Sequence, residues 1–423
     1  MADQYTNTKV QPKDYRSGWV IALIIAGTGL SLTIFYLGAE VALAVGFKKA
    51  LWAFGISTLI LSLLCLGTTR IGNRSRFSTY MILYFSFGKQ GAKILNFVFG
   101  LVLLGWFSVT LELLSVAVVD TVHATFDMAV PAWPIIMLMG ALITATTIYG
   151  IQSLERLTNL AVPFLALFLL YVYYVSFNEG MSFAQIVDFV PENPTMTLFE
   201  AVSILVGSTV FLPVFMADFS RFTRNDKHSL IAVLGIVIGS PFALYFSAVP
   251  AIQTGEVDII KIMTQFDLVL PAFALLFLST WVTNSLNLFS AALAFATVKT
   301  KWGYKKLTLV ASFFGITFAL LGITEYFFVF LNTLGVLIPS ISSIYLIHFF
   351  WIKKQRYELE DVQDWDFTAL ISWGSASAIA FCTYLELFEL THAYFVDSFL
   401  LGGIIYLILQ RKKIKRATDG GTH

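Results

Sequence analysis

The segment Gly18–Gly46 reads GWVIALIIAGTGLSLTIFYLGAEVALAVG and contains one charged side chain, Glu40. A helix of about 20 apolar residues crosses the hydrocarbon layer of a membrane, and this run is long enough to do so. Lipid offers no hydrogen-bond partner to an open strand, so we expect a spanning helix. Near its middle, Ala26–Leu30 reads AGTGL, and glycine weakens a helix. The sequence therefore predicts a spanning helix that is interrupted at its centre.

A second interruption is predicted in Val206–Pro213, which reads VGSTVFLP and lies five spans further along the chain. Proline removes a helix hydrogen bond and so favours a break. Interrupted helices at corresponding places in two halves of a chain are typical of transporters with inverted repeats. Glycine and proline are also common in ordinary membrane helices, which is the alternative explanation.

Apolar runs of spanning length recur along the whole chain. We expect an all-α integral membrane protein with about 12 transmembrane helices, in which helices 1 and 6 are broken. The predicted spans lie near residues 18–46, 50–69, 92–119, 133–150, 156–177, 197–219, 229–251, 268–297, 307–323, 325–351, 368–386 and 391–410.

The composition agrees with a membrane protein and argues against several other classes. Hydrophobic residues make up 57% of the chain and charged residues 13%, whereas about a quarter of a soluble protein is charged. The net charge is +1 and no basic block is present, so no nucleic-acid partner is expected. Cys65 and Cys382 lie in apolar runs without metal-binding spacing. No catalytic constellation is found, so we expect no enzyme and no cofactor other than a coupling ion.

Lys and Arg predict the orientation in the membrane, because they gather on the cytoplasmic side. With a cytoplasmic N-terminus, 24 of the 27 basic residues fall in inner segments, and only Lys48, Lys49 and Lys261 fall in outer loops. We therefore expect both termini in the cytoplasm and a multi-pass location in the cytoplasmic (inner) membrane. The predicted parts are a tail over 1–17, a transmembrane core of helices 1–10 over 18–351, and helices 11–12 with a cytoplasmic tail over 352–423.

Two acids lie within predicted spans. Glu112 is mid-span, where a carboxylate is energetically unfavourable unless it is neutral, paired or facing water. It is therefore a candidate proton carrier. A structural carboxyl bonded to a neighbouring helix is the alternative. Glu40 lies in the outer half of the first span and is a second candidate.

Aromatic and polar residues within spans mark a candidate solute path. Trp106 lies mid-span beside Gly105 and Ser108, which favours a wall for a flat ligand, although most buried aromatics only pack. The eighth span, Leu278–Asn287, reads LSTWVTNSLN, and a helix this polar either bonds its neighbours or lines a path. Hydroxyl and carbonyl oxygens suit a hard cation such as Na⁺.

Several segments taken together resemble the nucleobase–cation symporter-1 family, and bacterial cytosine permeases are the most similar members. They are Phe85–Gly88 (FSFG), Gly105–Phe107 (GWF), Ala217–Asn225 (ADFSRFTRN) and Trp281–Asn284 (WVTN), in the same order along the chain. The resemblance implies a LeuT-type fold of two five-helix inverted repeats and alternating access around a site at the membrane midplane.

The resemblance also implies roles for individual residues. Trp106 would stack on a base, and Leu103 takes the place of a glutamine one turn earlier. Ser208, Thr209 and Phe211 would contact substrate at the sixth-helix break, with Phe211 as a second stacking face. Asn284 would face the site. Cation ligands would be the carbonyls of Gly29, Leu32 and Ser279 together with the Thr283 hydroxyl, while Val282 replaces a second hydroxyl.

We therefore expect a secondary transporter that imports a nucleobase-like flat N-heterocycle with Na⁺ as the favoured coupling ion and H⁺ as the alternative. It is expected to work as a monomer in the lipid bilayer. The alternatives are a carrier of another small solute on the same fold, or a membrane sensor or enzyme that does not transport.

Overall fold

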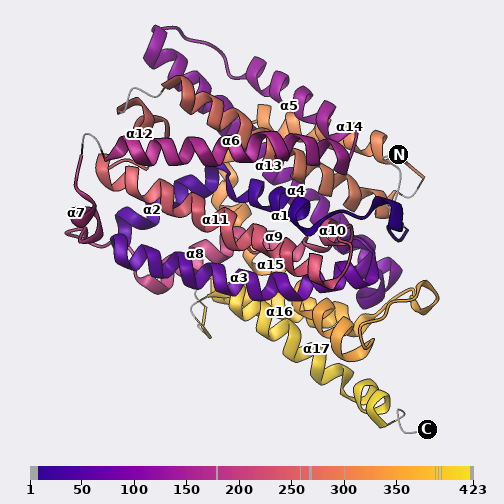
Figure 1. Ribbon diagram of the computed structural model, residues 1–423. Coiled ribbons are helices and arrows are strands. Elements are labelled where there is room, and N and C mark those ends of the chain that lie inside the picture. Colours follow the sequence, from indigo (N-terminus) through magenta and orange to yellow (C-terminus); the bar gives the residue numbers. More distant parts are fainter. Residues whose placement is uncertain are drawn as a thin grey trace.

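The computed structural model describes residues 8–177, 180–257, 259–265, 269–299, 301–385, 387–388, 390–391 and 393–419 (Figure 1). Residues 1–7 and 420–423 of the predicted tails lie outside the described part. Within these ranges the regular structure is helical, and a single bridge pairs Arg16 with Thr223. The predicted all-α class is confirmed.

The long helices follow the apolar runs of the sequence. They are α1 (Gly18–Gly29), α2 (Leu32–Val45), α3 (Phe47–Ser75), α4 (Thr79–Phe126), α5 (Trp133–Thr147), α6 (Ile151–Ser176), α8 (Leu198–Thr209), α11 (Asp226–Thr254), α13 (Val269–Val298), α14 (Tyr304–Leu320), α15 (Phe327–Ile347), α16 (Phe367–Tyr384) and α17 (Tyr394–Asp419). The short helices are α7 (Phe183–Val187), α9 (Phe211–Val214), α10 (Ala217–Ser220) and α12 (Ile259–Gln265).

Each of the twelve predicted spans coincides with helical structure. In the described part, eight helices are long and apolar enough to cross a membrane, and ten spans result if each of two bent helix pairs counts as one. The two remaining predicted spans are α5, with 15 residues, and α14, with 17 residues. The count of twelve therefore stays a prediction, because these two helices are short for a bilayer.

The first bent pair is α1 and α2, which meet at an angle of 58° where the sequence predicts a break. Helix α1 ends at Gly29, and Leu30 and Ser31 leave the helical conformation. A side chain at Gly29 would collide with the backbone of α11, since its Cβ would lie 2.5 Å from the Ser240 nitrogen. Glycine at this position therefore lets α1 and α11 approach closely beside the break.

The second bent pair is α8 and the short helices α9 and α10, with a bend of 41°. Pro213 lies within α9 and has no N–H to donate to the Thr209 carbonyl four residues earlier. The break thus falls at Val210, between Ser208–Thr209 and Phe211, as the sequence predicts. Both breaks agree with the interrupted helices of an inverted-repeat transporter.

Helix α4 contains a break that the sequence analysis did not identify. Gly88 has φ +77°, a left-handed conformation that favours glycine, and it divides a first helix, 79–87, from the long spanning part. Gln363 and Asp364 accept hydrogen bonds from Lys89 and Gln90 at 2.9 Å, which caps the second part.

The helices pack into two units around one large apolar core, with a second, small cluster of Ala39, Ala251 and Ile262. In the first unit, α11 packs against α1, α2 and α3, and α3 also contacts α8 to α10. In the second unit, α13 packs against α4, and α14 contacts α4, α5 and α13. Helix α6 contacts both units, while α15, α16 and α17 pack against one another. Both chain termini lie at one end of the bundle, which we call the termini end, and α7 and α12 lie at the opposite end (Figure 1).

Candidate functional site

A small cavity lies where the two helix breaks meet α4, α11 and α13. Its volume is about 60 Å³. That is enough for water molecules and well below the few hundred cubic ångströms of a typical ligand pocket. The lining residues are Thr28, Ser31, Thr33, Ile34, Trp106, Thr110, Ser208, Thr209, Phe211, Leu212, Phe215, Phe219, Ser240, Thr283, Leu286, Asn287 and Ser290. The first unit and the second unit both contribute walls, so a relative movement of the units would change the cavity.

Aromatic rings close one side of the cavity. Trp106 from α4 stacks on Phe211 from α9 with ring centroids 5.3 Å apart and planes 28° apart. Phe330 from α15 meets the Trp106 ring edge-on at 5.6 Å. A flat ligand between two rings needs two contacts of about 3.5 Å each, or about 7 Å in all. The predicted stacking faces are therefore brought together, but they are in contact with each other.

The polar part of the lining consists of hydroxyls and one amide, and none of the lining side chains is ionisable. Several of these hydroxyls donate to their own helices. Thr28 donates to the Ile25 carbonyl at 2.6 Å, and Ser208 and Thr209 donate to the Leu205 carbonyl at 3.2 and 2.6 Å. Since each hydroxyl has one proton, its oxygen is left to accept a further hydrogen bond.

The amide that lines the cavity is Asn287, whereas Asn284 lies behind it. Asn284 is fully buried, and it donates to the Phe107 carbonyl at 3.1 Å. Its oxygen meets the Thr110 hydroxyl and accepts from the Asn287 side chain at 3.4 Å. The predicted contact of Asn284 with substrate stays a prediction, and the structure places this residue in a bridge between α13 and α4.

The residues predicted to bind a cation lie on both sides of the first break. Gly29 and Leu32 flank it, with Gly29 ending α1 and Leu32 beginning α2. Across the cavity, Thr283 has a buried hydroxyl oxygen without a hydrogen-bond partner. The Ser279 hydroxyl donates to the Leu276 carbonyl at 3.2 Å and does not line the cavity. An orphaned hydroxyl oxygen opposite a helix break suits a hard cation.

The two predicted proton carriers lie away from the cavity. Glu112 accepts hydrogen bonds from the Thr324 backbone N–H at 3.0 Å and from the Thr324 hydroxyl at 2.6 Å. It thus holds the turn Ile323–Tyr326 against α4, which fits the alternative of a structural carboxyl. Glu40 is half-buried on α2 and is not part of the lining. Leu103 is buried in the core and also does not line the cavity.

Sequence reasoning missed several lining residues, among them Thr110, Ser240 and Asn287. Thr110 lies one turn after Trp106 on α4, so helical spacing was the available signal. Asn287 was noted only as part of the polar eighth span. Ser240 reaches the cavity because α11 approaches Gly29 closely, and nothing in the local sequence indicates that contact.

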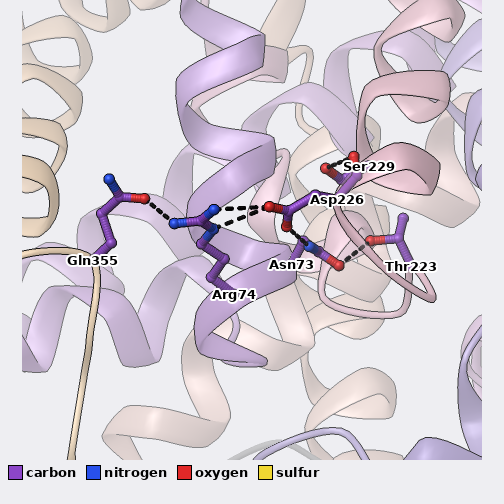
Figure 2. Close-up of polar contacts among 6 residues, drawn as sticks. All are labelled: Asn73, Arg74, Thr223, Asp226, Ser229 and Gln355. Carbon is purple, nitrogen blue, oxygen red and sulfur yellow. Dashed lines mark hydrogen bonds and ion pairs between the residues drawn. The ribbon is translucent and has the colours of Figure 1, made fainter.

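The ion pairs of Arg74 and Arg16 lie at the termini end, away from the cavity. Arg74 of α3 forms an ion pair with Asp226 of α11 at 2.8 Å and also meets Gln355, as Figure 2 shows. Asn73 donates to Asp226 at 2.6 Å and accepts from Thr223 at 2.8 Å (Figure 2). We call these five residues the Arg74 network. It ties α3, α11 and the segment after α15 together.

A second ion pair at the termini end joins the N-terminal segment to α6. Arg16 meets Glu155 at 3.0 Å, and both side chains are about three-quarters buried. The backbone of Arg16 also donates to the Phe222 carbonyl at 2.6 Å, and the Gly18 N–H donates to His228 Nδ1 at 3.0 Å. The N-terminal segment is thereby held against the first unit and α6 together.

Comparisons with known proteins identify relatives of this chain. A family described as permease for cytosine/purines, uracil, thiamine, allantoin matches residues 10–403. The cytosine permease of Escherichia coli (strain K12) is 27% identical over 350 residues, which is 82% of this chain and 81% of that protein. The hydantoin permease of Microbacterium maritypicum is 24% identical over 285 residues, 60% of this chain and 58% of that protein.

Solved structures show the same fold. A nucleobase-cation-symport-1 family transporter, Mhp1, in a closed conformation with bromovinylhydantoin bound has a TM-score of 0.85 at 19% identity, covering 97% of this chain and 95% of that chain. The inward-facing conformation of Mhp1 has a TM-score of 0.80. A Na⁺-coupled sialic acid symporter has a TM-score of 0.74 at 13% identity, covering 98% and 92%.

Proposed function

Because this chain belongs to the family of permeases for cytosine/purines, uracil, thiamine and allantoin, we propose that it imports an uncharged, flat N-heterocycle such as a nucleobase, coupled to a cation. Membership of this family makes the chain a multi-pass membrane transporter of a small molecule and not an enzyme. It also agrees with the resemblance to the nucleobase–cation symporter-1 family noted in the sequence.

The observation that carries the proposal is the Trp106–Phe211 stack at a cavity between two helical units. Two aromatic faces that part by about 2 Å would hold a planar ring between them. The same parting would enlarge a cavity that is at present too small for a nucleobase. Binding and a movement of the two units are thereby linked, as alternating access requires.

The absence of ionisable side chains from the described lining supports an uncharged substrate. A charged ligand enclosed among hydroxyl and aromatic groups would lose its hydration without gaining a counter-charge. Of the compounds in the family description, cytosine, uracil and allantoin fit this condition, and cationic thiamine does not.

For the coupling ion, Na⁺ is favoured by the orphaned Thr283 hydroxyl beside the break between Gly29 and Leu32. The Ser279 carbonyl would be a further ligand, and Val282 supplies no oxygen. Proton coupling through Glu112 is the alternative. It is less favoured because this carboxylate is engaged with Thr324 and lies outside the lining.

The orientation proposed from the basic residues puts the termini end in the cytoplasm, in a cytoplasmic (inner) membrane. The proposal supposes a monomer, because the cavity is completed by helices of one chain. The proposed division of the chain is the one predicted from the sequence: an N-terminal tail over 1–17, a transmembrane core over 18–351, and helices 11–12 with the C-terminal tail over 352–423.

A binding and uptake screen tests the proposal. The purified protein is heated with cytosine, uracil, hypoxanthine, allantoin and thiamine, each with NaCl or with choline chloride. A bound ligand raises the unfolding temperature by mass action. We expect at least one uncharged nucleobase to stabilise the protein more in NaCl and to be taken up by proteoliposomes. Stabilisation by thiamine alone would contradict the proposal.

A further inference from the structure

The two asparagines of α13 lie one turn apart and have different surroundings. Asn287 lines the cavity, with 5% of its surface exposed, whereas Asn284 is 0% exposed and lies behind the lining. Their side chains are joined by a hydrogen bond of 3.4 Å from Asn287 Nδ2 to Asn284 Oδ1. The orientation of one amide therefore determines the orientation of the other.

A backbone carbonyl sets the direction of this pair. The Phe107 carbonyl can only accept, so Asn284 must present its NH₂ group to it. The Asn284 oxygen then faces the Thr110 hydroxyl and Asn287, and only an NH₂ group on Asn287 can donate to it. Asn287 therefore turns its nitrogen towards Asn284 and keeps its carbonyl oxygen for the cavity. In the described part of the chain, no hydrogen bond uses this oxygen.

Three lining hydroxyls on α1 and α8 also present acceptors to the cavity. Ser208 and Thr209 donate their hydroxyl protons to the Leu205 carbonyl, so each hydroxyl presents only oxygen lone pairs to the cavity. Thr28 at the first break does the same through the Ile25 carbonyl. Hydrogen-bond acceptors thus face the cavity from α1, α8 and α13.

From this arrangement we infer that Asn287 is a specificity-determining residue that accepts a hydrogen bond from an N–H group on the edge of the substrate ring. Asn284 is a positioning residue, since it acts through Asn287. The substrate class is then an uncharged ring with N–H donors on at least two edges, one for Asn287 and one for Ser208 or Thr209. The inference rests on the proposed function and adds to it the polarity of the recognised edge.

Replacement of a substrate N–H by N–CH₃ would leave a buried acceptor unpaired and add a methyl group to a tight cavity. An unpaired buried group lowers affinity by about 10- to 100-fold. A carrier that recognises only the shape of the ring would not distinguish the N–H compound from its N–CH₃ analogue in this way.

Competition against labelled cytosine uptake tests the recognised edge, with 1-methylcytosine and N4,N4-dimethylcytosine as competitors. We expect the native protein to prefer cytosine over both by at least about tenfold. Asn287→Leu should lose most of the discrimination against one of them. Ser285→Ala, a control on the same helix that does not line the cavity, should keep the discrimination against both compounds. Equal competition by all three compounds in the native protein, or unchanged discrimination in Asn287→Leu, would overturn the inference.

Cysteine reactivity tests the placement of the two amides without any substrate. In a protein with Cys65 and Cys382 replaced by alanine, Asn287→Cys should react with a small methanethiosulfonate at least about ten times faster than Asn284→Cys. Ser285→Cys, which is buried and a mild change, replaces Asn284→Cys if that variant does not fold. Faster reaction at position 284 or 285 overturns the inference. A reactive thiol in Asn287→Cys that no nucleobase protects supports the placement and counts against the proposed function instead.

Discussion

The central cavity and the termini end of the bundle use different kinds of polar group. The cavity is lined by hydroxyls, one amide and aromatic rings, with no ionisable side chain among its lining residues. At the termini end, Arg16 pairs with Glu155 and Arg74 pairs with Asp226. These two ion pairs therefore join helix ends, whereas recognition at the cavity relies on shape and hydrogen bonds. Substitutions in the cavity should change substrate and ion selection, whereas those at the termini end should change conformation and stability.

The largest effect is expected from loss of the stacking face. Trp106→Ala should reduce the apparent affinity for the transported nucleobase by at least about tenfold, because a buried aromatic contact contributes about 1 kcal/mol beyond the area that it buries. Trp106→Phe should retain part of the affinity. Uptake by proteoliposomes as a function of substrate concentration measures this.

The matched control is Trp302→Ala, a tryptophan near the termini end that is 39% exposed and lies beneath Lys306. It should transport normally. If Trp106→Ala transports with native affinity while remaining folded, Trp106 is a packing residue and the cavity has been misassigned.

The next effect concerns the ion. Thr283→Val should weaken the sodium dependence of uptake several-fold, since it removes the orphaned hydroxyl and keeps the shape of the side chain. Val282→Thr should strengthen that dependence, because it restores an oxygen to the site. The measurement is initial uptake at constant pH and ionic strength while Na⁺ replaces choline. If uptake by the native protein, Thr283→Val and Val282→Thr depends on the Na⁺ concentration in the same way, the ion does not bind beside Thr283.

A smaller effect is expected at the Arg16–Glu155 pair, which holds the N-terminal segment against α6. Glu155→Gln should raise by a few-fold the rate at which a cysteine introduced at Ser290 is labelled from the termini end, because one contact between helices at this end is weakened. The double exchange Arg16→Glu with Glu155→Arg should restore the slow rate. An unchanged labelling rate in Glu155→Gln would show that the pair does not help to close this end.

The smallest effect is expected in the Arg74 network. Asp226→Asn should lower the free energy of unfolding by less than about 1 kcal/mol, because the Arg74–Asp226 pair is partly exposed and such pairs contribute little. Asn73 can still bond to the amide. Thermal unfolding of purified protein measures the change, and uptake should stay native. A severe loss of uptake would mean that this network takes part in the transport cycle.

The sequence predicts the helices and their breaks well because both follow from local chemistry. Apolar runs give the spans, the glycines at 27 and 29 lie where α1 ends, and Pro213 lies just after the second break. The break at Gly88 was missed because its partners, Gln363 and Asp364, are remote in the chain.

The candidate site was predictable only in part. Trp106 and Phe211 were both expected as stacking faces, but sequence does not tell that they rest on each other. Asn284 and Asn287 are three positions apart and lie on neighbouring faces of one helix, so periodicity does not separate a lining residue from one behind it. The distinction depends on the Phe107 carbonyl of α4, a contact made only in the folded chain.

An experimental structure with the best nucleobase from the binding screen tests the central claim most directly. The account predicts the ring of the ligand between Trp106 and Phe211, with the two aromatic planes about 7 Å apart instead of the present centroid distance of 5.3 Å, and a ring N–H directed at Asn287. A ligand bound elsewhere, with the Trp106–Phe211 stack unchanged, would contradict it.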